Sequence, residues 1–185
     1  MPVGHQATLA GEAGVLWNTL PGVRPIFSAG IDVAWSSHFE TRGAVLAATA
    51  ATSSLGSGRV ETELYAARGD ACATSNPRRV ALRACLGLAW GVVASRGIGF
   101  LEGRSPSQPW LAMPARGEVR ITVARNQAHA AWGVLATTEL LLTLRRAQIG
   151  VVGQRVDATM RTERTAVLTL PVLGGAATAG LFFEL

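Results

Sequence analysis

The most regular feature of the chain is a two-residue alternation that runs from Gly175 to Leu185. Every second position is small or apolar: Gly175, Ala177, Ala179, Leu181, Phe183 and Leu185. Successive side chains of a β-strand point to opposite faces, so this pattern predicts a strand with one continuous apolar face.

Seven earlier segments show the same alternation. They cover Ala7–Trp17, Ile26–Ser36, Gly43–Ala51, Arg59–Ala67, Val80–Val92, Trp110–Val123 and Ala131–Leu144. Turns or loops are expected between them, with a loop over Gly97–Pro109 and a long polar loop over Arg145–Arg164. Eight strands of this kind predict an all-β, closed, antiparallel up-and-down transmembrane barrel, and ten strands remain an alternative count.

Two segments also fit helices. Val80–Ala94 and Ala131–Arg146 are rich in alanine and leucine, which are good helix formers, and short apolar runs do not discriminate. Gly87, Gly91 and Gly133 favour strands instead. Pro114 weakens the sixth segment, because proline cannot donate to a ladder of hydrogen bonds.

Length and composition agree with a membrane barrel. The 185 residues suit one domain, which we assign to 7–185 after a disordered stretch over 1–6. Apolar residues make up 49% and charged residues 16%, and the mean hydropathy is +0.28. No apolar run is long enough for a transmembrane helix, whereas a barrel spreads its apolar residues over alternate positions. The alternative is an alanine-rich soluble protein.

The charge pattern argues against nucleic acid as a partner. All 17 basic residues are arginines, and they are scattered as singles and pairs without interleaved aromatic residues. The two cysteines, Cys72 and Cys85, have no histidine nearby and do not predict a metal site.

The same cysteines flank the turn-forming stretch Thr74–Pro77. This arrangement is typical of a disulfide across the base of a hairpin, which would stabilise the fold by about 3 kcal/mol in the chain-entropy model. Two unrelated buried thiols are the alternative.

Aromatic residues on the apolar faces stand near predicted strand ends, where the interfaces of a membrane barrel carry them. They are Trp17, Phe27, Trp35, Trp132 and Phe183. Trp90 lies deeper in its segment and fits this pattern less well.

Charged residues fall on the opposite faces, which would line the lumen. They are Glu12, Asp32, Glu61, Glu63, Arg83, Arg116, Glu118, Glu139 and Glu184. In the fourth segment this assignment puts Val60, Thr62, Leu64 and Ala66 on the outer face. Buried carboxylates need cationic partners, so the acidic excess implies lumen water or a third strand that places Arg42 inward. Eight strands leave a lumen only wide enough for side chains, and we expect it to be plugged.

No constellation for catalysis or for a cofactor is evident. Ser37, His38 and Glu40 are too close in sequence to form a relay, because adjacent side chains diverge. His5 and His129 lie in a terminus and a turn. We therefore predict that the protein is not an enzyme and binds no cofactor.

The chain resembles small bacterial outer-membrane β-barrel proteins that carry no assigned activity. The matching stretches are Cys72 with Cys85–Leu88, Pro109–Ala112, Pro171–Gly175 and Gly180–Leu185. The resemblance implies an outer-membrane location and a monomer surrounded by lipid. It also implies that the outer-membrane insertion machinery reads Leu181, Phe183 and Leu185. In barrels of this kind the final residue is usually phenylalanine, whereas here it is Leu185. No signal peptide is visible over Met1–His5.

The function expected from this resemblance is a structural or surface-interaction role, through the Gly97–Pro109 and Arg145–Arg164 loops. The alternatives are a soluble barrel that binds a small apolar ligand and a lipid-modifying barrel enzyme.

Overall fold

The computed structural model describes residues 6–55, 58–75, 79–98, 107–125, 130–145, 148–157 and 160–185, with side chains except at 55, 58 and 148–168. This part of the chain contains ten strands. They are β1 (Gln6–Trp17), β2 (Arg24–Ala34), β3 (Phe39–Leu55), β4 (Gly58–Thr74), β5 (Val80–Ile98), β6 (Ser107–Arg125), β7 (Ala131–Arg145), β8 (Gln148–Asp157), β9 (Met160–Thr169) and β10 (Leu173–Glu184). No helix in these residues could cross a membrane.

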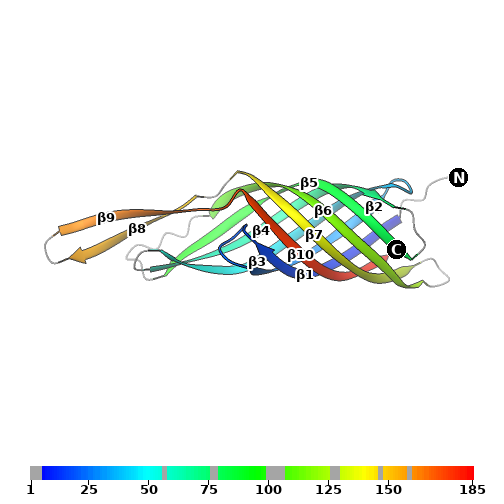
Figure 1. The fold of residues 1–185 in the computed structure, drawn as a ribbon, viewed down its shortest axis with the longest axis horizontal. Coiled ribbons are helices and arrows are strands. Elements are labelled where there is room, and N and C mark those ends of the chain that lie inside the picture. The colour runs from blue at the N-terminus through cyan, green and yellow to red at the C-terminus, as the bar shows by residue number, and fades with distance from the viewer. Residues whose placement is uncertain are drawn as a thin grey trace.

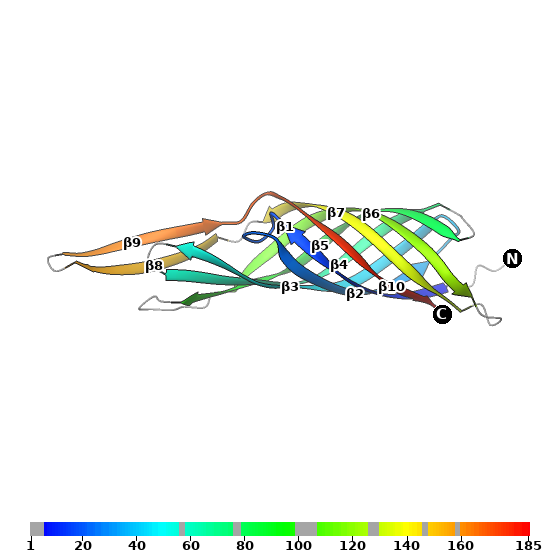
Figure 2. The ribbon, with the colours of Figure 1, turned by 60° about the horizontal axis from the view of Figure 1, so that its bottom comes forward.

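Eight of the strands close into an antiparallel barrel in the order β1-β10-β7-β6-β5-β4-β3-β2. Sequence neighbours pair throughout, except that β10 pairs with β7 and closes the barrel against β1. The strands cross the long axis obliquely (Figures 1 and 2). This confirms the predicted all-β, closed, eight-stranded fold. Segments that fitted either a strand or a helix are strands.

The two ends of the barrel differ. Both chain termini lie at the end that carries the β2–β3, β4–β5 and β6–β7 connections, which we call the turn end (Figure 1). We call the other end the loop end. The four strands joined there in pairs are the longest in the barrel: β3 and β4 have 17 residues each, and β5 and β6 have 19 each. About 9 to 11 tilted residues cross a bilayer, so these four strands continue beyond an embedded band.

The stretch expected as a polar loop over Arg145–Arg164 is instead mostly a second β-structure. After β7, strands β8 and β9 form a two-stranded antiparallel sheet with ten successive pairs, from Gln148↔Thr169 to Asp157↔Met160. This hairpin projects from the loop end along the barrel axis (Figures 1 and 2). Its β-branched valines and threonines favour strands, but its polar residues hid the alternation of a membrane strand.

Other boundaries also differ from the sequence-based expectation. The third strand begins at Phe39, the first begins at Gln6 inside the stretch expected to be disordered, and Ser107–Pro109 belongs to β6 rather than to a loop. Residues 1–5 and 99–106 lie outside the described part. Pro114 remains within β6, but the β5–β6 register passes from Leu86↔Ala115 to Ala89↔Ala112 without pairs between them, as expected where proline offers no N–H.

Glycines on both faces of the barrel wall let large rings lie flat across neighbouring strands. Phe182 of β10 is 1% exposed and pairs with Gly133 of β7. A Cβ atom added at Gly133 would lie 2.7 Å from the Phe182 ring and would overlap the Ile121 carbonyl oxygen. On the outer wall, the Trp17 indole covers Gly175 in the same way, 2.5 Å from an added Cβ. The absence of a side chain at these two positions is therefore required for packing.

We expect Gly133→Ala to destabilise the barrel by about 1–3 kcal/mol, because the added methyl group overlaps backbone and ring atoms that cannot both withdraw. Urea-driven unfolding in detergent micelles measures this. Gly43→Ala is the matched control, since nothing lies within 4 Å of its added Cβ and it should change the free energy by less than about 0.5 kcal/mol. Equal effects of the two variants would contradict the packing argument.

Candidate functional site: a plugged barrel with a projecting hairpin

The turn-end half of the barrel interior holds a balanced set of buried charges. Five arginines and five carboxylates are each no more than 8% exposed: Arg42, Arg68, Arg83, Arg116, Arg120, Glu12, Asp32, Asp70, Glu118 and Glu139. They come from seven of the eight barrel strands. Because an unpaired buried charge costs several kcal/mol, this balance is a condition for closing the barrel.

Glu118 of β6 is the most heavily paired of these carboxylates. Arg83 Nη1 donates to Glu118 Oε1 over 2.7 Å. Arg116 and Arg120, which lie on β6 like Glu118, each pair with the same carboxylate. Arg42 Nη1 approaches from β3 at 3.7 Å. Four arginines thus converge on a carboxylate whose side chain is 0% exposed.

Glu12 and Asp32 link the first two strands to this group. Arg116 Nη2 donates to Glu12 Oε1 over 2.8 Å, and Arg42 pairs with the same oxygen. Asp32 accepts from Arg120 over 2.5 Å and from Arg83 over 3.2 Å. The contacts join strands that lie on different sides of the barrel, so side chains cross the lumen instead of lining it.

A second, smaller group lies beside the first. Arg68 Nη1 contacts Glu139 Oε2 at 2.5 Å, and Arg68 Nε lies 3.1 Å from Asp70 Oδ2. Glu139 belongs to β7 and Arg68 to β4, so this pair also spans the interior.

The loop-end half of the interior is apolar. Its core consists of side chains that are at most 2% exposed, chiefly Leu16, Leu20, Val60, Leu64, Val93, Trp110 and Leu170. Leu20 comes from the short β1–β2 connection, which folds over the mouth of the barrel. Asn18 and Gly22 adopt positive φ values of 54° and 77° there and turn the chain inward. The described interior is therefore filled at both levels, which disfavours an apolar ligand inside a soluble barrel.

The predicted lumen charges are placed as follows. Glu12, Asp32, Arg83, Arg116, Glu118 and Glu139 are in the interior. Glu184 is 19% exposed at the turn end, 3.4 Å from the exposed Arg125. Arg42 points inward, which was one of the two explanations given for the acidic excess, but Arg68, Asp70 and Arg120 were not among the predicted lumen charges.

The placement of Glu61 and Glu63 in the lumen is wrong. In β4 the buried positions are Val60, Thr62, Leu64 and Ala66, followed in the same phase by Arg68, Asp70 and Cys72. The glutamates stand on the outer wall, and Glu63 accepts a 2.9 Å hydrogen bond from the Tyr65 hydroxyl. At this level of β4 the outward side chains include two glutamates and the interior is apolar. A rule that places the apolar residues of a strand outside therefore assigns the two faces of this part of β4 the wrong way round.

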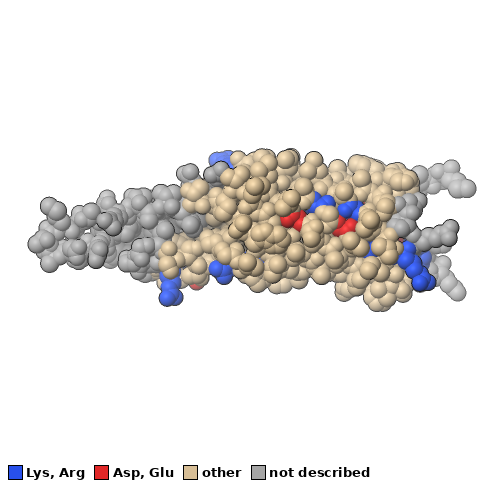
Figure 3. All heavy atoms as spheres, in the orientation of Figure 1, with Lys and Arg blue, Asp and Glu red and all other residues tan. Residues whose placement is uncertain are grey.

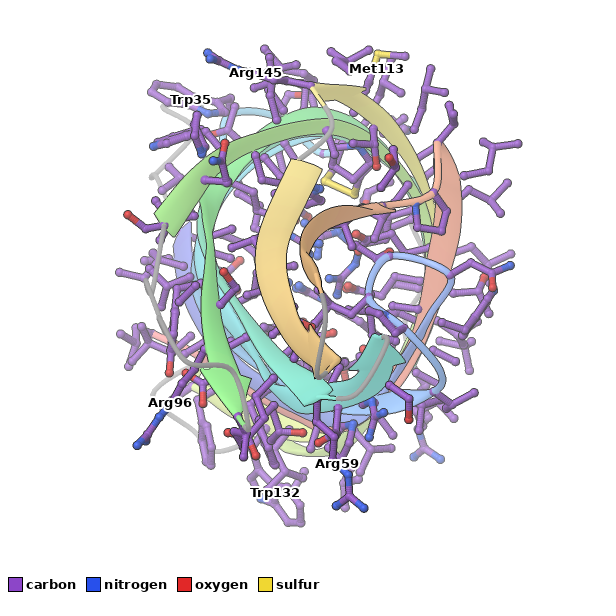
Figure 4. The ribbon with its side chains drawn as sticks, turned by 90° about the vertical axis from the view of Figure 1, so that its left-hand side faces the viewer. Trp35, Arg59, Arg96, Met113, Trp132 and Arg145 are labelled. Atoms are coloured by element: carbon purple, nitrogen blue, oxygen red, sulfur yellow. A yellow bond between two sulfur atoms is a disulfide. The ribbon has the colours of Figure 1, made fainter. Side chains whose placement is uncertain are left out.

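The outer wall carries a broad band of exposed apolar side chains. In Figure 3 most of the described surface of the barrel is tan, the colour of uncharged residues, with a few charged atoms visible within it. Phe27, Trp35, Trp132 and Phe183 are 43–53% exposed near strand ends, and Trp17 is half-buried. Trp90 is 56% exposed and pairs with Ala67, two positions from the Val92↔Tyr65 pair. Leu181 is 49% exposed and Leu185 71%, on the same face as Phe183. Figure 4 shows Trp35, Trp132, Arg59, Arg96 and Arg145 pointing away from the barrel axis.

No catalytic relay forms around the β2–β3 turn. Ser37 Oγ and His38 Nδ1 lie 2.8 Å apart, so these adjacent side chains do meet, contrary to the expectation that they diverge. Glu40, however, turns into the barrel and pairs with Arg83 at 2.6 Å. The described residues also contain no group of three or more histidine, cysteine or acidic side chains suited to a metal ion.

No family model matches the chain, and no curated protein is similar to it in sequence. Solved structures do match along nearly its whole length. A major outer membrane protein from Thermus thermophilus aligns with a TM-score of 0.68 at 10% identity, over 98% of this chain and 100% of that one. The fold is that of a small outer-membrane β-barrel.

Two further barrels of this kind align similarly. Ail, the attachment invasion locus protein of Yersinia pestis, in complex with the heparin analogue sucrose octasulfate, gives a TM-score of 0.59 at 10% identity over 99% of this chain and 100% of its own. Neisserial surface protein A gives 0.56 at 13% identity over 96% of this chain and 95% of its own. At these identities the outer-membrane barrels share the fold with this chain.

We expect Glu118→Gln to destabilise the barrel by about 3–5 kcal/mol, because four arginines then lose a common buried counter-charge. Urea-driven unfolding in micelles measures the change. Glu184→Gln is the matched control and should cost less than about 1 kcal/mol, since its partner Arg125 is exposed. A Glu118→Gln barrel as stable as the control would show that the ion pairs do not hold the interior.

We also expect the barrel to conduct no steady ionic current in a planar bilayer, because paired charges and an apolar layer block the lumen in series. Single-channel recording after reconstitution tests this. Steady, protein-dependent conductance of porin size would overturn the plugged interior and would indicate transport.

Proposed function

We propose that this protein resides in a bacterial outer membrane, where its barrel anchors the β8–β9 hairpin outside the cell as an element for surface interaction. The observation that carries this proposal is the combination of a filled interior with a hairpin that projects beyond it. A plugged barrel offers no route for a solute. The part of the molecule left to carry a function is the β8–β9 hairpin that it displays.

The outer wall supports the membrane location. Exposed leucine, valine, isoleucine and aromatic side chains surround the barrel, and an exposed apolar surface of this extent is unfavourable in water. Outer-membrane barrels have short turns on the periplasmic side and longer loops outside. By this rule the turn end, with both termini, faces the periplasm and the hairpin faces outward.

The distribution of charge favours an anionic partner. Among the described residues outside the interior, the loop end and the hairpin strands carry more arginines than carboxylates: Arg24, Arg59, Arg96, Arg145, Arg155, Arg161 and Arg164 against Glu61, Glu63, Asp157 and Glu163. At the turn end, Arg79 and Arg125 lie outside the interior together with Glu184, whereas Glu40 turns inward to Arg83. Positive charge concentrated at the loop end attracts polyanions. The Ail structure, with its bound heparin analogue, supports the same idea by analogy of fold.

Membrane residence is tested by exporting the chain behind a cleavable signal. The protein should fractionate with the outer membrane, resist carbonate extraction and migrate differently on gels before and after boiling. A monodisperse protein in detergent-free buffer would overturn the proposal.

The role of the hairpin is tested on immobilised heparin at low salt. Removal of residues 148–169 should abolish retention while the heat-dependent gel shift persists. Arg155→Gln/Arg161→Gln/Arg164→Gln keeps the hairpin and should weaken binding by on the order of 100-fold, from about 1 kcal/mol per arginine near an anionic surface. Arg79→Gln at the turn end is the control and should have no effect. Unchanged retention of the hairpin variants would refute an anionic partner at this site.

A further inference from the structure

Cys72 and Cys85 form a disulfide that faces the interior of the barrel. The two residues are register partners on β4 and β5, with Cα atoms 4.1 Å apart. They are 1% and 6% exposed. Figure 4 shows the sulfur–sulfur bond inside the ring of strands. This confirms the pairing predicted from the sequence and places it on the lumen side.

Charged side chains surround the disulfide in the same register layer. Glu40 of β3 stands opposite Cys72, and Arg116 of β6 stands opposite Cys85. The Arg83–Glu40 pair at 2.6 Å and the Arg116–Glu12 pair at 2.8 Å tie this layer to other strands. A protein large enough to catalyse disulfide formation cannot reach these sulfur atoms in the closed barrel.

We propose that the Cys72–Cys85 disulfide forms before the barrel closes, on an unclosed β4–β5 segment, through a dithiol oxidase of the compartment that the chain crosses. The two cysteines are 13 residues apart, so they meet within one hairpin and need no distant strand. The interior ion pairs that join different strands, such as Glu12 with Arg116, link residues that are far apart in sequence. The bond therefore precedes the ion pairs that later enclose it.

The chemistry is an ordinary thiol–disulfide exchange. One cysteine thiolate attacks the disulfide of the oxidase and forms a mixed disulfide. The second cysteine attacks that bond and releases the oxidase as a dithiol. The two cysteines lose two electrons and two protons, the oxidase disulfide gains both, and no other reactant is needed. Closure of the barrel then shields the product from reductants.

The test compares the folded and the unfolded chain. Reduced protein is folded into detergent micelles, its folded fraction is separated by the heat-dependent gel shift, and a dithiol oxidase in its disulfide form is added. Free thiols are counted by alkylation and mass spectrometry. We expect the folded, reduced barrel to oxidise on the order of 100-fold more slowly than the urea-unfolded chain, because the thiols become accessible only on opening. A reduced chain that cannot close at all gives the same conclusion, since the bond must then come first.

A matched pair of single-thiol variants checks that the reagents reach the barrel. Cys85→Ser leaves Cys72 in the interior, whereas Cys72→Ser/Cys85→Ser/Ala73→Cys places one thiol at the next residue, which is exposed on the outer wall. In the folded state only the outer thiol should be alkylated quickly. Rapid alkylation of Cys72 in the folded barrel, or equal oxidation rates of folded and unfolded chains, would overturn the proposal.

Discussion

The structure depends on pairing charges in a space that water cannot fill. Once eight strands close, each arginine in the lumen must meet a carboxylate or remain unpaired at high cost. Arg42 meets Glu12 and Asp32, and these contacts hold only if β1, β2 and β3 are in register. A slip of one residue turns a strand over and places its arginine in the outer wall. The buried charges therefore fix the register as well as filling the barrel.

Much of the fold could be predicted from the sequence because each barrel strand repeats with a period of two. The apolar outer faces of β1, β2, β5, β7 and β10 follow directly from that period. The period alone does not say which face is outside. In β4 the same face is outside along the whole strand, but before Tyr65 its outward residues are the charged Glu61 and Glu63 and its inward residues are apolar, so these glutamates were assigned to the wrong side. The β8–β9 hairpin was missed for a related reason, since a strand in water need not have an apolar face.

Whether an interior contact could be predicted depends on how far apart its two residues stand in the sequence. The disulfide could be predicted because its two residues flank one turn. The Glu12–Arg116 and Arg68–Glu139 pairs join strands that meet only when the barrel closes, so no local pattern indicates them. Arg68 and Asp70 also lie beyond Ala67, where the predicted fourth segment ended. Their inward position is apparent only from the structure, in which β4 continues in the same phase through Arg68 and Asp70.

The division of the interior into a charged half and an apolar half has a consequence for how the sequence can change. Leu16, Leu64 or Val93 can be exchanged for another aliphatic residue of similar volume with little loss, because apolar packing tolerates such swaps. Arg42 or Glu118 can change only together with its partners, which lie on other strands. Sequence drift in this lineage should therefore be continuous at the loop end and concerted at the turn end, so that ancestral combinations of charge persist long after the apolar residues have diverged.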